Sequence, residues 1–241
     1  MTSRTALVFG GSRGIGAAIV EALAADGYDV AFTYTSAAPA ALPGAGSGRK
    51  ITAHRADIRS PDEVAAVFEA VKAEHAGPLA CVVANAGINV LPGPVGQFPD
   101  ERFRELVEVN IVGAFNVLRA AAQNVSDGGT IIGLTTSMVR VAIPGVGPYT
   151  ASKAAVESLL RSMSKELAGR GVRVNGVAPG PVDTDLFRAG KDEAAIARAA
   201  GLSPFGRVGE PAEVAAVVAF LASDKASWVH GQIVQPNGGM V

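Results

Sequence analysis

The sequence predicts an α/β fold in which helices cover both faces of a parallel sheet. Short apolar runs alternate with longer helical patterns along all 241 residues, the order typical of this class. The apolar runs are rich in Val, Ile and Ala and lack the polar alternation of a strand with one wet face. No repeat or linker interrupts the pattern, so residues 1–241 are predicted to form a single domain.

Seven runs have the length and composition of buried strands. They are residues 5–9, 29–34, 51–56, 79–84, 130–134, 172–178 and 232–235. Helical patterns occupy residues 15–26, 62–75, 100–124, 148–169 and 211–222. A helix should also pack between the second and third strands. Pro39, Pro43 and three glycines within residues 37–48 predict that it is short or absent.

Composition excludes several classes of function. The chain has 21 basic and 22 acidic residues, so no strong field attracts nucleic acid or an anionic membrane. No apolar run is long enough to cross a bilayer, and the N-terminus lacks the pattern of a signal peptide. The single cysteine, Cys81, lies in an apolar run and is predicted to be a buried thiol. We expect a cytoplasmic protein without a metal site.

The first predicted strand ends in a glycine-rich loop, Gly10-Gly-Ser12-Arg13-Gly14-Ile15-Gly16, which opens the first helix. Glycines let the backbone turn tightly and approach a pyrophosphate at the N–H groups of the helix. The loop also reads as Gly10-x-Ser12-x-Gly14, the pattern of a hydrolase nucleophile elbow. That elbow normally follows several strands, and it gives Gly16 no role. Dinucleotide binding is therefore favoured.

The end of the second strand indicates which dinucleotide binds. An NAD site typically has an acid there that accepts the ribose 2′-hydroxyl, and we place that position at Thr33. The run Phe32-Thr33-Tyr34-Thr35-Ser36 has no carboxylate, and Asp26 and Asp29 lie at the wrong end of the strand. Arg13 could offer its guanidinium to a 2′-phosphate, unless it merely faces solvent. NADP(H) is favoured over NAD(H), with Thr33, Tyr34 and Ser36 in the site.

Tyr149 and Lys153 are four residues apart in the fourth predicted helix, so both side chains lie on one face. A lysine ammonium there would favour the phenolate and lower the tyrosine pKa, which gives a general acid/base near neutral pH. The pair alone is weak evidence, since Tyr-x-x-x-Lys occurs by chance on many helices.

The glycine loop, Asn85-Ala86-Gly87, Asn110, Tyr149/Lys153 and Pro179-Gly180 stand in a fixed order. Together they resemble the NAD(P)-dependent short-chain dehydrogenase/reductase family. The resemblance runs from about residue 4 to Asn237-Gly-Gly239. It implies a single-domain, doubly wound Rossmann fold with a seven-stranded parallel sheet, usually assembled as a homotetramer.

The resemblance also implies roles for individual residues. Tyr149 would give a proton to a carbonyl oxygen while the nicotinamide delivers hydride, and Lys153 would lower the tyrosine pKa and bind the nicotinamide ribose. Asn110 would hold a water that links Lys153 to solvent, or would cap backbone inside a kinked helix. The remaining cofactor positions are Asp57 and Ile58 at adenine, Asn85, Ala86 and Gly87 beneath the cofactor, Pro179 and Gly180, and Val182 and Thr184 at the carboxamide.

Two positions depart from the family pattern. The glycine loop usually opens with a threonine that pins it, whereas this loop opens with Gly10. The catalytic serine usually lies thirteen residues before the tyrosine, where this chain has Thr136. Strand alternation favours Thr136, but a bulge would give the role to Ser137.

The sequence thus predicts an NADPH-dependent reductase of a ketone or aldehyde, reversible with the alcohol. A lid segment of about residues 182–208, together with Met138 through Val146, should select a modest, uncharged small-molecule substrate. Residues 123–127 lack the basic side chains of reductases that use acyl carrier protein. The alternative is a non-catalytic NADP-binding sensor or regulator on the same fold.

Overall fold

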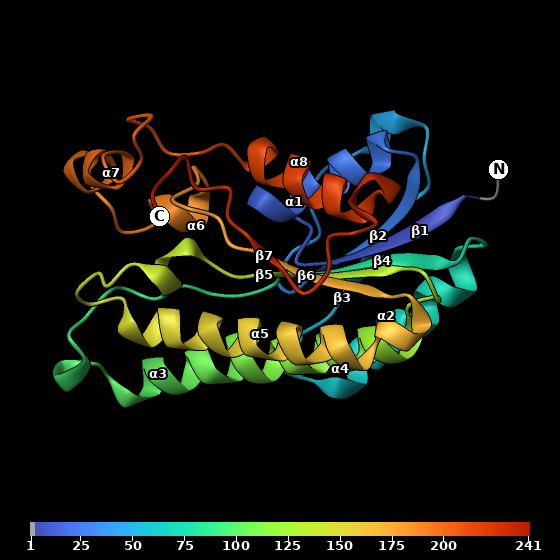
Figure 1. The fold of residues 1–241 in the computed structure, drawn as a ribbon, viewed down its shortest axis with the longest axis horizontal. Coiled ribbons are helices and arrows are strands. Elements are labelled where there is room, and N and C mark those ends of the chain that lie inside the picture. The colour runs from blue at the N-terminus through green and yellow to red at the C-terminus, as the bar shows by residue number, and fades with distance from the viewer. Residues whose placement is uncertain (1–2) are drawn as a thin grey trace.

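The structure, a computed structural model, describes residues 3–241 and contains one seven-stranded parallel sheet (Figure 1). Its strands are β1 (Arg4–Phe9), β2 (Tyr28–Tyr34), β3 (Ile51–Arg55), β4 (Leu79–Ala84), β5 (Thr130–Leu134), β6 (Arg173–Val177) and β7 (Ile233–Val234). All seven predicted strands are present, with ends that differ by no more than one residue. The predicted fold class is confirmed.

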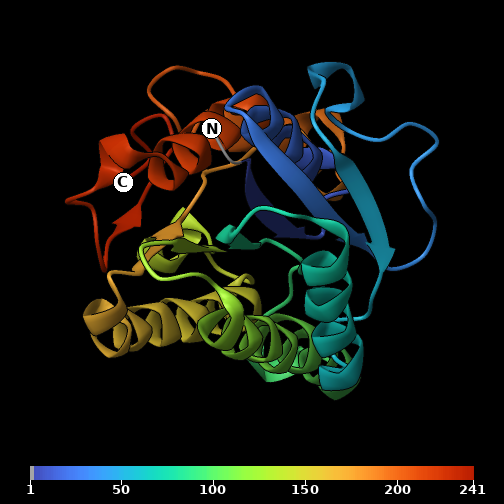
Figure 2. The same cartoon turned by 90° about the vertical axis from the view of Figure 1, so that its right-hand side faces the viewer.

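Two layers of helices enclose the sheet. Helices α1 (Gly14–Ala25) and α8 (Pro211–Ala222) cover one face, and α2 (Pro61–Glu74), α4 (Ala114–Asn124) and α5 (Gly147–Glu166) cover the other. Figure 2 shows α1 and α8 in blue and red on one side, with the teal, green and yellow helices on the opposite side. Because both faces are covered, the central strands β1, β4 and β5 are mostly apolar.

The strand order is β3-β2-β1-β4-β5-β6-β7, so the chain reverses direction across the sheet between β1 and β4. In open parallel sheets, ligands bind in the crevice outside the carboxyl ends of the strands at such a switch point. The glycine loop follows β1, and Asn85-Ala86-Gly87 follows β4. Topology therefore brings two of the predicted motifs together at this crevice.

The predicted helix over residues 100–124 consists of three consecutive segments. α3 (Asp100–Leu106) continues through a π-helical segment (Val107–Gly113) into α4. π-Helical insertions occur frequently at functional sites, and Asn110 stands inside this one. Asn110 therefore stands where the regular α-helical pattern is interrupted.

Other expectations concern single segments. Residues 37–48 contain only a 3₁₀ turn, Ala45–Ser47, as their prolines and glycines predict. The predicted lid segment holds two short helices, α6 (Asp185–Arg188) and α7 (Glu193–Ala200). Cys81 is a buried free thiol. Among residues 3–241, no helix is long and apolar enough to span a bilayer, and no cluster of metal-ligating side chains is present.

Candidate active site

A cavity of about 400 Å³ lies at the carboxyl ends of β1, β2 and β4. The predicted cofactor residues that line it are Gly10, Ser12, Arg13, Gly14, Ile15, Gly16, Thr33, Tyr34, Asp57, Ile58, Asn85, Ala86, Gly87 and Thr184. Ser36, Pro179, Gly180 and Val182 do not line it. Other lining residues were not predicted as cofactor contacts: Ala56, Arg59, Ile88, Val109 and Asp185 each adjoin a predicted site residue in the sequence, and Glu105 lies four residues before Val109.

The glycine loop forms a cradle suited to a pyrophosphate. Gly10 and Gly14 have φ values of +79° and +55°, a region that favours glycine. A Cβ at Gly10 would lie 2.9 Å from Ala86 Cα, so the loop and the β4 end leave no room for a side chain there. Arg13 is the N-cap residue of α1, but its side chain makes no capping hydrogen bond, and the first turn of the helix carries no acidic residue. The first N–H groups of α1 thus stay available for an anion.

Side chains at the ends of β2 and β4, the two strands that flank β1, hold the loop. The backbone N–H of Gly10 donates to Thr33 Oγ1 at 3.0 Å, and Asn85 Nδ2 donates to the Gly10 carbonyl at 2.7 Å. The Gly11 N–H donates to the Thr33 carbonyl at 3.0 Å. The hydroxyl that the loop lacks at its own first position is therefore supplied by Thr33 of β2.

This contact corrects the role given to Thr33. The sequence analysis places the acid of an NAD site at Thr33, but this side chain is 2% exposed and its hydroxyl is used by the loop. Tyr34, the next residue, also lines the cavity and is half-buried. An acid that contacts a ribose would have to stand at the more accessible Tyr34. Arg13 is exposed at the cavity and makes no ion pair among residues 3–241.

The far end of the cavity carries Asp57 and Ile58. The Arg59 guanidinium donates two hydrogen bonds to Asp57 Oδ2, at 2.9 and 2.5 Å, and holds the pKa of that carboxyl below its ordinary value. Asp57 is thus an ionised group with acceptor capacity at this end. Ile58 is 4% exposed and belongs to the core beneath α4.

Tyr149 and Lys153 occupy the first two turns of α5. Burial lowers the pKa of the Lys153 ammonium to about 8, and its Nζ donates to the Leu134 carbonyl at 3.2 Å. Burial also raises the pKa of the Tyr149 hydroxyl to about 12. The expected lowering of the tyrosine pKa by Lys153 is absent here, because burial is what shifts it. The Tyr149 phenol therefore carries its proton at neutral pH.

Asn110 joins the π-helical segment to the β4 end. Its Oδ1 accepts from the Ile88 N–H at 2.8 Å, and its Nδ2 donates to the Ile88 carbonyl at 2.9 Å and to Ser152 Oγ at 3.1 Å. A Cβ at Gly87 would lie 3.0 Å from Asn110 Oδ1 and 3.2 Å from Lys153 Nζ. The predicted residues Gly87, Asn110 and Lys153 are therefore neighbours in space.

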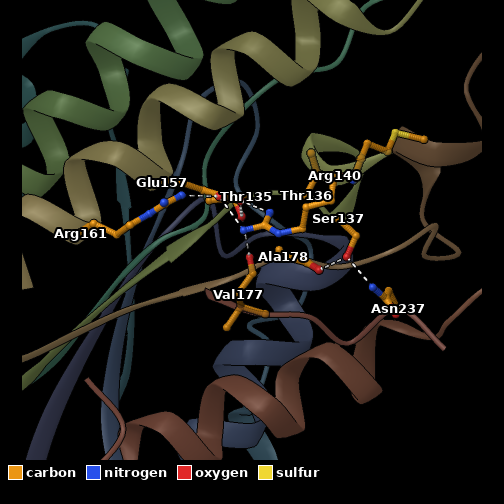
Figure 3. A network of polar contacts seen from close by, with 10 residues as sticks. Thr135, Thr136, Ser137, Arg140, Glu157, Arg161, Val177, Ala178 and Asn237 are labelled. Atoms are coloured by element: carbon orange, nitrogen blue, oxygen red, sulfur yellow. Dashed lines mark hydrogen bonds and ion pairs between the residues drawn. The ribbon is translucent and has the colours of Figure 1, made fainter. Parts of the chain in front are cut away.

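The hydroxyls of Thr136 and Ser137 have different surroundings (Figure 3). Ser137 is fully buried; its Oγ donates to the Ala178 carbonyl at 2.6 Å and accepts from Asn237 Nδ2 at 2.9 Å. Thr136 Oγ1 only accepts, at 3.3 Å, from the Met138 N–H. Its proton has no acceptor among residues 3–241. Thr136 therefore keeps a free hydrogen-bond donor, whereas Ser137 has used its own.

The remaining predicted residues follow β6. The Pro179 carbonyl accepts from the Ser137 N–H at 2.9 Å, and the Gly180 N–H donates to the Pro236 carbonyl at 3.1 Å. Val182 forms an isolated bridge with Gly209 through the backbone of Pro181 and Asp183. Its own N–H and carbonyl stay outside that bridge. Thr184 caps α6 by accepting from the Phe187 N–H at 3.1 Å.

Comparison with known proteins places this site in a family. A family model described as Enoyl-(Acyl carrier protein) reductase matches residues 10–241. A short-chain type dehydrogenase/reductase from Picea abies is 44% identical and covers 99% of this chain and 92% of its own. An NADPH-dependent aldehyde reductase-like protein from Arabidopsis thaliana is 38% identical, and the match covers 100% of this chain and 95% of the relative. The 3-oxoacyl-[acyl-carrier-protein] reductase MabA of Mycobacterium tuberculosis is 38% identical, and the match covers 99% of this chain and 93% of the relative.

A solved structure has the same fold and a bound dinucleotide. The crystal structure of a blue fluorescent protein from a metagenomic library in complex with NADPH superposes with a TM-score of 0.90 at 35% identity. The alignment covers 100% of this chain and 98% of that one. The protein therefore belongs to the short-chain dehydrogenase/reductase family, and it is an NAD(P)-dependent oxidoreductase acting on C=O and CH–OH groups.

Proposed function

We propose that this protein reduces a ketone or aldehyde with NADPH, reversibly with the corresponding alcohol. The observation that carries the proposal is the placement of Lys153, four residues from Tyr149 on α5, against the Leu134 carbonyl, two residues before Thr136, whose hydroxyl proton has no acceptor among residues 3–241. Bound NADPH would supply the hydride. The protein residues would supply the proton and would hold the substrate oxygen.

Each residue has a distinct role in this proposal. The Tyr149 hydroxyl gives its proton to the substrate oxygen as negative charge develops there. Thr136 donates a hydrogen bond to the same oxygen, while Ser137 stays bound to Ala178 and Asn237. Lys153, still mostly charged at pH 7 with a pKa near 8, stabilises the tyrosinate left behind. Asn110 fixes the backbone around Ile88 and gives the lysine a polar neighbour.

The cradle fits a pyrophosphate, and NADP(H) is the proposed cofactor rather than NAD(H). The glycine loop leaves its backbone open, and the end of β2 carries no carboxylate. Arg13 would donate to the 2′-phosphate, which brings up to two negative charges. The names of the Arabidopsis and metagenomic proteins, which mention NADPH, support this choice.

Assembly and location are further parts of the proposal. Phe103, Val112 and Phe115 expose apolar surface on α3, the π-helical segment and α4, which suits burial in a homotetramer. Light scattering on the purified protein would test this assembly. The chain is proposed to form one catalytic domain with a lid over residues 182–208 and to work in the cytoplasm, which fractionation would test; the Arabidopsis relative is called chloroplastic.

A panel of carbonyl compounds tests the function directly. Purified protein would be mixed with NADPH and, in turn, small aldehydes, ketones, a 3-oxoacyl thioester and an enoyl thioester, and the loss of NADPH absorbance followed. The proposal predicts that NADPH is oxidised when an aldehyde or a ketone is present. Turnover of the 3-oxoacyl thioester alone would favour the chemistry named for the mycobacterial relative, and tight NADPH binding without any turnover would favour the sensor.

A further inference from the structure

A buried carboxylate stands one helical turn beyond Lys153. Glu157 is 0% exposed and lies on the buried face of α5, next to Val156 and one turn before Leu160. A carboxylate held away from water needs hydrogen-bond partners for both oxygens. Glu157 has four donors: Thr135 Oγ1 at 3.1 Å, Arg140 Nη1 and Nη2 at 2.7 and 2.8 Å, and Arg161 Nη2 at 3.1 Å (Figure 3).

Two of these partners flank the candidate catalytic hydroxyls. Thr135 directly precedes Thr136, and Arg140 ends the 3₁₀ turn Ser137–Arg140 that follows it. The Arg140 guanidinium binds the carboxylate with two parallel hydrogen bonds, an arrangement that fixes direction as well as distance. Arg161 lies on α5 itself, four residues from Glu157, and its side chain is 59% exposed.

The contacts join two elements that must stay in register for catalysis. Lys153 holds the carbonyl of Leu134, and Glu157, one turn later on the same helix, holds the hydroxyl of the next residue, Thr135. Thr136 therefore stands between a residue bound to α5 and Ser137, which is bound to Ala178 and Asn237. Among residues 3–241 the Thr136 side chain makes only the 3.3 Å contact to the Met138 N–H, and its carbonyl accepts from the Val139 N–H at 3.2 Å, so contacts within this turn and the anchored neighbours set its position.

We propose that Glu157 and Arg140 form a clamp that positions Thr136 relative to Tyr149. The clamp, defined as Arg140, Glu157 and Thr135, lies outside the residues that line the cofactor cavity and is proposed to act on the reaction through Thr136, so its members are positioning residues. This inference rests on the proposed function, because it assigns Thr136 the carbonyl oxygen. Misplacement of a reacting group by about 1 Å can lower the rate by roughly 10²-fold.

The test compares the two arginines that bind the Glu157 carboxylate: Arg140, which belongs to the clamp, and Arg161, which does not. Arg140→Met removes the clamp's cation, Arg161→Met removes the exposed partner of the same carboxylate, and Arg140→Lys restores a charge without the paired hydrogen bonds. We expect Arg140→Met to lower kcat about tenfold or more, with Arg140→Lys in between. The Kd for NADPH should stay within about twofold in all three, as should the kcat of Arg161→Met.

Hydrogen exchange gives a readout that needs no substrate. Amide exchange over residues 135–140 should become faster in Arg140→Met and stay unchanged in Arg161→Met, with NADPH present. Glu157→Gln, once shown to be folded, is a second probe, because the oxygen of its side-chain amide can still accept the hydrogen bond from Thr135. Equal kcat and equal exchange in Arg140→Met and Arg161→Met would overturn the clamp. If the unmodified enzyme turns over no carbonyl, the proposed function fails, and the exchange comparison still decides whether the clamp exists.

Discussion

Replacing Lys153 by methionine should make the protein more stable at neutral pH while it abolishes turnover. Lys153 is 7% exposed, and burial lowers the pKa of its ammonium from 10.5 to about 8. Each tenfold change in an ionisation constant corresponds to ~1.4 kcal/mol, so the buried charge costs about 3 kcal/mol of folding free energy at pH 7. Methionine removes that cost and fills a similar volume.

The gain is reduced by one lost contact and depends on pH. The hydrogen bond from Lys153 to the Leu134 carbonyl contributes about 1 kcal/mol, which leaves a net gain of about 2 kcal/mol. For a chain of this size that raises Tm by roughly 4–8 °C. Because the pKa of the folded state is lowered, the unfolded chain binds more protons between about pH 8 and 10.5, and the unmodified protein gains stability over that range. The advantage of the variant should therefore be largest at pH 7 and near zero at about pH 9.5.

Calorimetry of both proteins at the two pH values, without cofactor, measures this difference. Lys165→Met is a matched control, since Lys165 lies on the same helix, is exposed and makes no side-chain hydrogen bond or ion pair within the described residues 3–241. We expect the control to change Tm little, and equally at both pH values. A Lys153→Met protein that is less stable at pH 7, or whose advantage does not change with pH, would refute the assignment of an energetic cost to the buried ammonium.

Three further predictions concern the site. Thr136→Val should lower kcat by about 10–100-fold with little change in Tm, whereas Ser137→Ala should lower Tm, because it loses two buried hydrogen bonds, and should affect kcat less. Steady-state kinetics and calorimetry measure both effects, and a larger loss of kcat in Ser137→Ala would mean that Ser137 binds the carbonyl. Arg13→Ala should weaken NADPH binding roughly 10–100-fold and leave NADH binding unchanged, and equal losses of affinity for both cofactors would exclude a 2′-phosphate contact. Tyr34→Asp should shift the preference toward NADH, whereas Thr33→Asp should weaken the binding of both cofactors because it disturbs the hydrogen bond to Gly10. Alcohol oxidation should speed up from pH 7 to 10, because the raised pKa of Tyr149 keeps its base form scarce at neutral pH, whereas carbonyl reduction should not; parallel pH profiles would contradict the role of the phenol as proton donor.

The strands and the glycine loop could be predicted because their signals are local. A buried parallel strand is a continuous apolar run, so β4 and β5 were located to the residue. Pro211 fixes φ at the first turn of α8, which begins there. The loop motif lies between a strand and a helix whatever the rest of the chain does, and its predicted residues all line the cavity.

The parts that the sequence could not show depend on distant partners. The π-helical segment exists where Asn110 binds the backbone of Ile88, a contact between residues 22 apart. Thr33 and Tyr34 look alike as strand-end residues, and only packing against Gly10 decides which one is enclosed. The hydrogen bonds that hold the buried Glu157 carboxylate come from Thr135 and Arg140, 22 and 17 residues away in the sequence.

The tyrosine pKa shows the same limit in energetic terms. Spacing correctly indicated that Tyr149 and Lys153 share one face of α5, but the direction of the pKa change depends on burial, which spacing does not show. Two effects oppose each other at such a site, because a nearby cation lowers a phenol pKa and burial raises it. In this structure burial dominates.

Turnover of Tyr149→Phe tests the central claim most directly. The variant removes one hydroxyl that has no partner among residues 3–241, so the fold and the NADPH site should be unaffected. We predict an unchanged Kd for NADPH, read from the fluorescence of the bound nicotinamide, and a kcat for the best carbonyl substrate lowered by ~10²–10⁴-fold. A variant that binds NADPH normally and reduces the carbonyl at a rate within a few-fold of the unmodified enzyme would contradict the account.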